Sequence, residues 1–542
     1  MSLTVSEEDR VGGKPEPDLI NITFSLWLTV AVIATVLGHL AILDLPFDQD
    51  AHSSGSAHFM QMGHEFAVHG LRTTGGVPIQ NNDPLGKLPD VYVHMPPGLS
   101  LLLGALFRVF GESDAVGRLT TLAMTLATAL ATAWVVRICA GQRAAILAAF
   151  AYLTTPVVFI FGKVLACEYL GVVLLVLAAV PLLKTFGVTG SVRRWWLVAG
   201  ACVMTLAVLS AWQPALAPAG LALALLAVHD RRLRPVTYVY AGAAFLSVAA
   251  VLGWYLLQYP GLFVGLSEAM RARSLPMLHS AKMTQAWPNV HEFTDQAGYV
   301  QPPVPLAEII KSQLRRIELF HPFVVIAALF VVASCVRRSP DRAFNKVQIA
   351  VAFLTLPYLL WSLVMAQHSA IHEFVALYAA PVASLSFGIA LVLGLARIER
   401  ASHFSGRRLA QALAVLAVPA MMMLPLWHET TRQWDSSRLT AAPQIPFARA
   451  IRDNTAADAV VLVPSETKVH VYYSQRHLIR GIENDGVLDR ALPMAVQAFP
   501  DSTLYLAMPP DETWRFPEAL QRFSAQARSR DVILLLLRKP NR

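Results

Sequence analysis

Two aspartates near the start of the chain have a spacing that suits acid–base or metal chemistry. Asp48 and Asp50 stand close behind a long apolar run and form an Asp-x-Asp pair. Carboxylates at a membrane surface are costly to ionise, because a low dielectric and a neighbouring carboxylate both raise the pKa of a carboxyl group. The pair predicts a general base or a divalent-metal site, and a solvated loop after a helix end is the competing interpretation.

Three further ionisable residues stand where the backbone is restricted or turning. His94 comes two residues before Pro96-Pro97. The prolines favour an extended backbone here, which would hold the imidazole at a fairly fixed angle. Lys163 and Glu168 lie in GKVLACEYLG, a short turn that brings a base and an acid to the ends of two apolar runs. An ordinary loop histidine and a carboxylate that complements a helix N-terminus are the alternatives.

A histidine pair forms the fourth group. His368 and His372 are four residues apart, so on a helix they would share one face. Such a pair can bind zinc, but zinc proteases carry HExxH, and here Glu373 follows the second histidine. A protease is therefore disfavoured. The pair predicts a contact to a phosphate or a sugar hydroxyl, with a helix-capping role as the alternative.

The composition requires that membrane helices position these residues. Hydrophobic residues make up 55% of the 542 and charged residues only 15%, against about a quarter in soluble proteins. Several apolar runs exceed the roughly 18 residues that cross a hydrocarbon core. The four cysteines indicate neither a disulfide framework nor a metal site. About eleven spans are expected, centred near residues 32, 128, 151, 177, 203, 221, 247, 327, 356, 384 and 417.

The basic residues predict the orientation of these spans. The net charge of +8 arises mostly in short gaps, and every second gap is rich in Lys and Arg, as expected of cytoplasmic loops. We therefore expect a cytoplasmic tail at 1–19 and a transmembrane domain at 20–428. Its large loops at 44–116 and 259–316 would face outward, together with all four groups of polar residues. Within the first loop, Pro96 to Phe110 predicts a helix lying at the interface.

The remaining segment, 429–542, has ordinary polar composition and predicts a small extracytoplasmic α/β domain. Short apolar strands are expected at 459–463, 469–473, 503–507 and 532–537, with helices at 488–499 and 517–527. The segment contains no glycine-rich phosphate loop and no recognisable nucleophile. The fold class is thus a polytopic α-helical membrane protein with a small C-terminal α/β domain.

The order of motifs resembles the GT-C glycosyltransferases, in particular the protein O-mannosyltransferases and the lipid A aminoarabinose transferases. The resemblance covers roughly residues 20 to 400. It rests on HMPPGLSLLLGALFRVFGESDAVGRL, which runs from His94 to Leu119, on GKVLACEYLG, and on HSAIHEF. In that family the acid after the first span acts as the catalytic base, and the matching residue here is Asp50 or Asp48. The spacing to His69-Gly70-Leu71 favours Asp50.

The resemblance also implies roles for the other polar residues. Family members usually have Asp-Glu at the first motif, where this chain has Asp-Gln and Gln-Asp, and more often Asp where Glu168 stands. By position, Glu168 joins the catalytic group. The remaining cations and polar residues would bind the donor phosphate or the substrate: His94, Arg118, Lys163, Arg271, Arg273, Lys282, His368, His372 and Glu373.

The implied function is that of an inverting glycosyltransferase of the cell inner (plasma) membrane. It would move a sugar from a polyprenyl-phosphate donor to a lipid, glycan or protein acceptor on the outer face, without a nucleic-acid partner. No particular cofactor is implied, and a divalent metal at Asp48 and Asp50 is an open alternative. A transporter or flippase of lipid-linked sugars would predict charged residues in the middle of the spans and two matching halves of the chain. The sequence shows few such charges and no matching halves. An envelope assembly protein is the other alternative.

Overall fold

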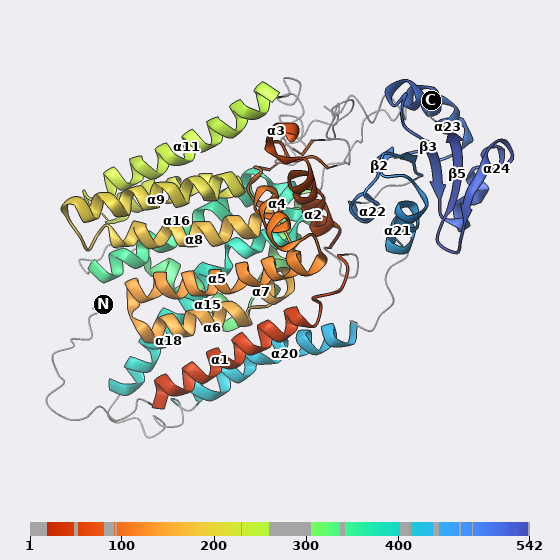
Figure 1. The fold of residues 1–542 in the computed structure, drawn as a ribbon. Helices are drawn as coiled ribbons and strands as arrows, with labels where there is room; N and C mark the ends of the chain where they lie inside the picture. The colour runs from red at the N-terminus through yellow and green to blue at the C-terminus, as the bar shows by residue number, and fades with distance from the viewer. Residues whose placement is uncertain are drawn as a thin grey trace.

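The computed structural model describes residues 19–47, 53–80, 91–92, 95–228, 230–258, 305–335, 342–400, 411, 413–436, 444–464, 468–479 and 481–539. Most of the chain forms a bundle of helices that run side by side (Figure 1). The helices of the bundle are α1 (Leu19–Leu40), α5 (Asp114–Ala140), α6 (Gln142–Thr154), α8 (Cys167–Lys184), α9 (Gly190–Ser210), α10 (Ala217–Val228), α11 (Leu233–Gln258), α15 (Pro322–Cys335), α16 (Arg342–Val364), α18 (Ala380–Arg400) and α20 (Val418–Ser436).

The prediction of a polytopic membrane protein is confirmed. Within the described residues, seven helices are long and apolar enough to span a membrane, and an eighth span is possible if α14 (Leu306–Arg315), η4 (Arg316–Leu319) and α15 count together. The chain bends by 109° between the helical segment Leu306–Leu319 and α15. Each of the eleven predicted centres falls within a helix, and those near 151, 221, 327 and 417 fall outside the seven long spans.

One end of the bundle is covered by short helices. α2 (Ser53–Val68), α3 (Gly70–Thr74) and α4 (Gly98–Phe110) cross the end that faces the C-terminal domain (Figure 1). The predicted interfacial helix is α4, which begins two residues later than expected, after Pro97 as its N-cap. The short basic connections, such as those between α5 and α6 and between α8 and α9, lie at the opposite end (Figure 1).

Four short helical elements between the spans complete the covered end. The segment between α6 and α8 contains α7 (Pro156–Phe161), and the segment between α16 and α18 contains α17 (Ala366–Ile371) and η5 (Glu373–Tyr378). η2 (Gln213–Leu216) joins α9 to α10. These breaks between spans place polar backbone and side chains at the end of the bundle, which a continuous helix would not do.

The C-terminal domain is a five-stranded sheet with helices on both faces. Its strands are β1 (Val460–Leu462), β2 (His477–Ile479), β3 (Leu504–Met508), β4 (Ser524–Arg528) and β5 (Ile533–Arg538), in the order β2-β1-β3-β5-β4. β1 is parallel to β2 and β3, and β5 is antiparallel to β3 and β4. Alternate residues of β1 face opposite cores: Val460 packs with α23 (Asp485–Ala498), and Val461 packs with α21 (Gln444–Asn454).

Two predictions for this domain are wrong in detail. Residues 469–473 form part of helix α22 (Lys468–Ser474), not a strand. Their β-branched and aromatic side chains are all buried, because α22 packs between α21 and α2, and tertiary burial overrides local propensity. The expected helix at 517–527 is α24 (Pro517–Arg522) followed directly by β4.

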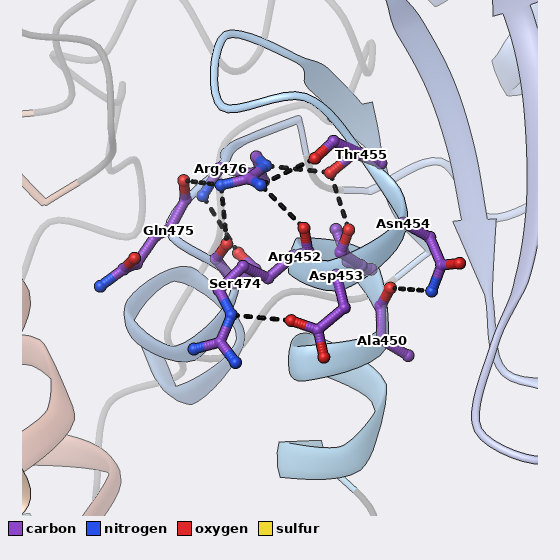
Figure 2. Close-up of polar contacts among 9 residues, drawn as sticks. Ala450, Arg452, Asp453, Asn454, Thr455, Ser474, Gln475 and Arg476 are labelled. Carbon is purple, nitrogen blue, oxygen red and sulfur yellow. Dashed lines mark hydrogen bonds and ion pairs between the residues drawn. The ribbon is translucent and has the colours of Figure 1, made fainter.

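A buried arginine holds α21 and α22 together (Figure 2). Arg476 is 8% exposed, and its guanidinium donates hydrogen bonds to the carbonyl oxygens of Arg452 (2.8 Å) and Thr455 (2.8 Å) at the end of α21. It also donates to Thr455 Oγ1 (2.9 Å) and to the carbonyls of Ser474 and Gln475 at the end of α22. The last carbonyls of a helix have no partner within the helix, so Arg476 caps both helices at once.

Candidate functional site

An acid–imidazole pair lies at the covered end of the bundle. Glu168 is the second residue of α8 and is 2% exposed. Its Oε1 lies 4.0 Å from His368 Nε2, and its Oε2 accepts a hydrogen bond from the thiol of Cys167 at 3.1 Å. The predicted clusters around residues 168 and 368, 200 positions apart in sequence, are therefore brought together.

The hydrogen bonds of His368 determine which ring nitrogen carries the proton. Trp361 Nε1 can only donate, and it lies 3.3 Å from His368 Nδ1, which must therefore accept. The neutral imidazole then carries its proton on Nε2, the nitrogen that faces Glu168. The ring of His372 lies beside that of His368, with 4.6 Å between centroids, as the spacing predicted. Glu373, the first residue of η5, is exposed.

Two cations that the sequence singled out lie next to the backbone that follows α1. Arg118 is buried in α5, and its guanidinium stacks on the ring of Phe47, with 4.1 Å from Cζ to the centroid. It donates hydrogen bonds to the carbonyl of Pro46 (3.2 Å) and to that of Lys163 (3.5 Å). Lys163 is 5% exposed. The family-like motifs around residues 118 and 163 thus contact each other directly.

Buried hydroxyl groups fix the turn that carries Lys163. Tyr169 donates a hydrogen bond to Thr125 Oγ1 (2.7 Å), and Thr125 in turn reaches the carbonyl of Gly162 (3.3 Å). On the other side of the turn, the backbone N–H of Leu165 donates to Ser56 Oγ in α2 (2.9 Å). Polar groups buried in this way are costly to displace, so the turn is held in one conformation.

Sequence reasoning missed a third buried cation, Arg316. It is 2% exposed at the bend between α14 and α15 and donates to Ser369 Oγ (2.8 Å), Gln313 Oε1 (3.1 Å) and the carbonyl of His372 (3.3 Å). Within the part of the chain that the structure describes, its Nε has no hydrogen-bond partner and no carboxylate lies within 4.0 Å of its guanidinium. An arginine pair, 315–316, on the face predicted to be poor in basic residues was the signal that could have found it.

Several predicted residues lie outside the described residues, and for these the roles stay predictions: Asp48, Asp50, His94, Arg271, Arg273 and Lys282. Neighbours in sequence place the ends of two of these segments. Phe47 stacks on Arg118, and the carbonyl of Met95 accepts a hydrogen bond from Tyr255 at 3.1 Å. Among the described residues, no group of three His, Cys, Asp or Glu side chains could hold a metal ion.

The chain matches known proteins in both sequence and fold. Residues 94–254 match the sequence model of the dolichyl-phosphate-mannose–protein mannosyltransferase family. The structure is similar to that of ArnT from Cupriavidus metallidurans bound to undecaprenyl phosphate, with a TM-score of 0.61 and 14% identity over 94% of this chain and 98% of that one. The fold is that of the GT-C glycosyltransferases. The resemblance read from the three sequence motifs is confirmed.

More distant GT-C structures share the same architecture. The archaeal oligosaccharyltransferase AglB from Archaeoglobus fulgidus, solved with an inhibitory peptide and a dolichol-phosphate, has a TM-score of 0.54 and 15% identity over 89% of this chain and 69% of that one. The arabinofuranosyltransferase AftD from Mycobacteria has a TM-score of 0.51 and 15% identity, and this chain covers 40% of its length. No match was found among curated protein sequences. The fold shared with these structures is that of a multi-pass membrane protein, in agreement with the apolar helices of the described residues.

Proposed function

We propose that this GT-C chain is an inverting glycosyltransferase that uses a polyprenyl-phosphate sugar as donor. One observation carries the proposal. Buried cations and an acid–imidazole pair from distant parts of the sequence converge at the bundle end next to Phe47, the residue before Asp48. The same fold in ArnT was solved with undecaprenyl phosphate bound, and in AglB with a dolichol-phosphate. These are the lipid phosphates that such a cluster would be expected to bind.

In the proposed reaction, carboxylates activate the acceptor hydroxyl and cations stabilise the leaving phosphate. Asp50, or Asp48, would accept the proton of an acceptor hydroxyl as that oxygen attacks the anomeric carbon. The bond from that carbon to the phosphate oxygen breaks in the same displacement, so the configuration inverts. The leaving group is a polyprenyl phosphate, and its growing negative charge needs cations already in place. Lys163, Arg118 and Arg316 are buried at this end of the bundle, and His94 is a further donor by position.

Glu168 and His368 suit contacts to hydroxyl groups. The Nε2–H of His368 can donate and the carboxylate of Glu168 can accept, and 4.0 Å separates His368 Nε2 from Glu168 Oε1. We assign this pair to a sugar or acceptor hydroxyl. A divalent metal would need Asp48 and Asp50 as its ligands, since the described residues offer no such group. Metal dependence therefore stays a prediction for that pair.

We also propose that this site faces away from the cytoplasm. The short connections rich in Lys and Arg lie at the opposite end of the bundle from α2, α4 and the C-terminal domain (Figure 1). By the positive-inside rule, this arrangement supports an outer-face position at the inner membrane for the candidate site and the C-terminal domain. A donor whose lipid tail stays in the bilayer can reach a site at this surface without leaving the membrane.

A transfer assay tests the proposal. Purified full-length protein in nanodiscs is incubated with undecaprenyl-phosphate sugars that carry mannose, arabinofuranose or 4-amino-4-deoxyarabinose, with membranes of cells lacking the protein as acceptor. Mass spectrometry follows free undecaprenyl phosphate and the modified acceptor. We expect one donor to be consumed, and we expect Asp50→Asn and Glu168→Gln each to reduce turnover by about a hundredfold or more. Glu318→Gln, an exposed carboxylate in η4, is the matched control.

The result that contradicts the proposal is full activity in Asp48→Asn, Asp50→Asn and Glu168→Gln. Movement of intact lipid-linked sugar between leaflets without release of undecaprenyl phosphate would instead favour a flippase. An envelope defect in cells lacking the protein that Glu168→Gln restores completely would favour an assembly role.

A further inference from the structure

The C-terminal domain touches the bundle at Phe47, which precedes the predicted Asp48-Asp50 pair in the sequence. Tyr473 in α22 is 6% exposed, and its hydroxyl accepts a hydrogen bond from the backbone N–H of Phe47 at 2.8 Å. The same hydroxyl donates to Asp114 Oδ1 at 2.8 Å. Asp114 is the first residue of α5, and Phe47 immediately precedes Asp48. One side chain therefore joins the C-terminal domain, the start of a transmembrane helix and the backbone that leads to the Asp48-Asp50 pair.

The segment that Tyr473 holds is fixed from its other side by the bundle. Arg118, one turn along α5 from Asp114, stacks on the ring of Phe47 and donates a hydrogen bond to the carbonyl of Pro46. The ring, the preceding carbonyl and the N–H of Phe47 each have a partner. Consecutive Cα atoms are about 3.8 Å apart, so fixing Phe47 restricts where Asp48 can lie.

Tyr473 itself is held firmly in the C-terminal domain. The ring of Tyr472 packs against that of Tyr473, with 4.8 Å between centroids, and α22 packs on α2. Arg476, two residues past the end of α22, clamps that end to α21 (Figure 2). Burial and the charge of Asp114 raise the pKa of Tyr473, so its hydroxyl stays protonated and able to donate.

We infer that Tyr473 is a positioning residue for sugar transfer: through its hydroxyl, the C-terminal domain holds Phe47 and so the catalytic aspartate that follows. This inference rests on the proposed function, because it needs Asp48 or Asp50 to be the base. The oxygen of a general base must lie within about 2.6–3.2 Å of the heavy atom whose proton it takes, and a shift of about 1 Å can cost a hundredfold in rate. A contact that never touches substrate can therefore limit turnover.

The test is Tyr473→Phe in the full-length protein, assayed with the donor that the wild type consumes. The variant keeps the ring but leaves the Phe47 N–H and the Asp114 carboxylate without their shared partner. We expect kcat to fall about ten- to hundredfold, while KM for the donor and Kd for undecaprenyl phosphate change less than about twofold. Tyr472→Phe removes the neighbouring hydroxyl of the same helix and should keep kcat within about twofold of the wild type.

A second pair of variants guards against a folding artefact. Asp114→Asn keeps an oxygen that accepts from Tyr473, whereas Asp114→Ala does not, so Asp114→Asn should retain more kcat. Wild-type kcat in Tyr473→Phe, together with an inactive Asp50→Asn, would overturn the inference and leave the proposed function standing. A lowered unfolding temperature with unchanged kcat per folded molecule would also overturn it. Full activity in both Asp48→Asn and Asp50→Asn would overturn the proposed base and this inference together.

Discussion

Arg476 in the C-terminal domain and Arg316 in the bundle are both almost completely buried, yet the fold uses them differently. Arg476 donates to four backbone carbonyls and a hydroxyl, so its guanidinium is committed to the fold (Figure 2). Among the described residues, Arg316 donates to Ser369, Gln313 and the His372 carbonyl, and its Nε has no acceptor there. Burying a charge without a counter-ion costs free energy, and a fold accepts that cost where an anionic ligand completes the site.

The largest expected effect is on the stability of the C-terminal domain, which should depend on Arg476. Arg476→Met should destabilise the C-terminal domain by about 3 kcal/mol or more, because it leaves buried carbonyls of α21 and α22 without donors. Hydrogen–deuterium exchange of the full-length protein would show faster exchange in residues 444–479, while the bundle stays protected. Arg530→Met, an exposed arginine of the same domain, should change nothing. Equal protection of residues 444–479 from exchange in both variants would contradict a structural role for Arg476.

The second effect concerns activity. Arg316→Met should reduce kcat/KM for the donor about a hundredfold, because a cation that meets the leaving phosphate is lost. The unfolding temperature should stay the same or rise, since the substitution removes a buried charge that no carboxylate of the described residues pairs with. Arg315→Met, its exposed neighbour, serves as the matched control. A large loss of stability with normal activity would show that Arg316, like Arg476, stabilises the fold and does not bind the donor.

The sequence predicted one of these regions better than the other. Apolar runs and the alternation of basic gaps were enough to predict the bundle, because the bilayer imposes length and orientation on every span. The motifs around Glu168, Lys163 and His368 were found because polar residues at the ends of apolar runs are unusual. Arg316 was missed, since its role depends on a bend of 109° that brings it to His372 from a distant part of the chain. Helix α22 was missed because its buried residues have the composition of a strand.

A smaller effect on kcat is expected from the hydrogen bond that orients His368. Trp361→Phe removes the donor that fixes the tautomer of His368. The proton can then move to Nδ1, and the Nε2–H that faces Glu168 is lost part of the time. We expect kcat to fall about fivefold, the equivalent of roughly one neutral hydrogen bond. Trp427→Phe, an exposed tryptophan of α20, is the control, and equal kcat values in the two variants would argue against this tautomer.

The smallest effect lies between the two regions and depends on pH. His64 in α2 pairs with Glu112 at 2.6 Å. Burial lowers the pKa of His64, but the hydrogen bond and the charge of Glu112 outweigh it, so the pKa is raised above 6.5. The pair therefore stabilises the folded protein fully below pH 6.5, and this stability is lost as the pH rises through the folded-state pKa. We expect His64→Gln to cost about 1 kcal/mol at pH 5.5 and little at pH 9.

Thermal unfolding of the wild type and of His64→Gln across this range checks that prediction. Glu112→Gln should show the same pH dependence, and the double variant should lose no more than either single one. A difference that grows with pH would mean that His64 is neutral in the folded protein.

The account's central claim is that the bundle end beside the C-terminal domain binds the phosphate of a polyprenyl donor. A cryo-EM map of the full-length protein in nanodiscs with undecaprenyl phosphate tests it most directly. The account predicts phosphate density within hydrogen-bond distance of Arg316 or Lys163, with the lipid tail leaving between helices into the bilayer. Phosphate density at the opposite, basic end of the bundle, with none beside Glu168, would contradict it.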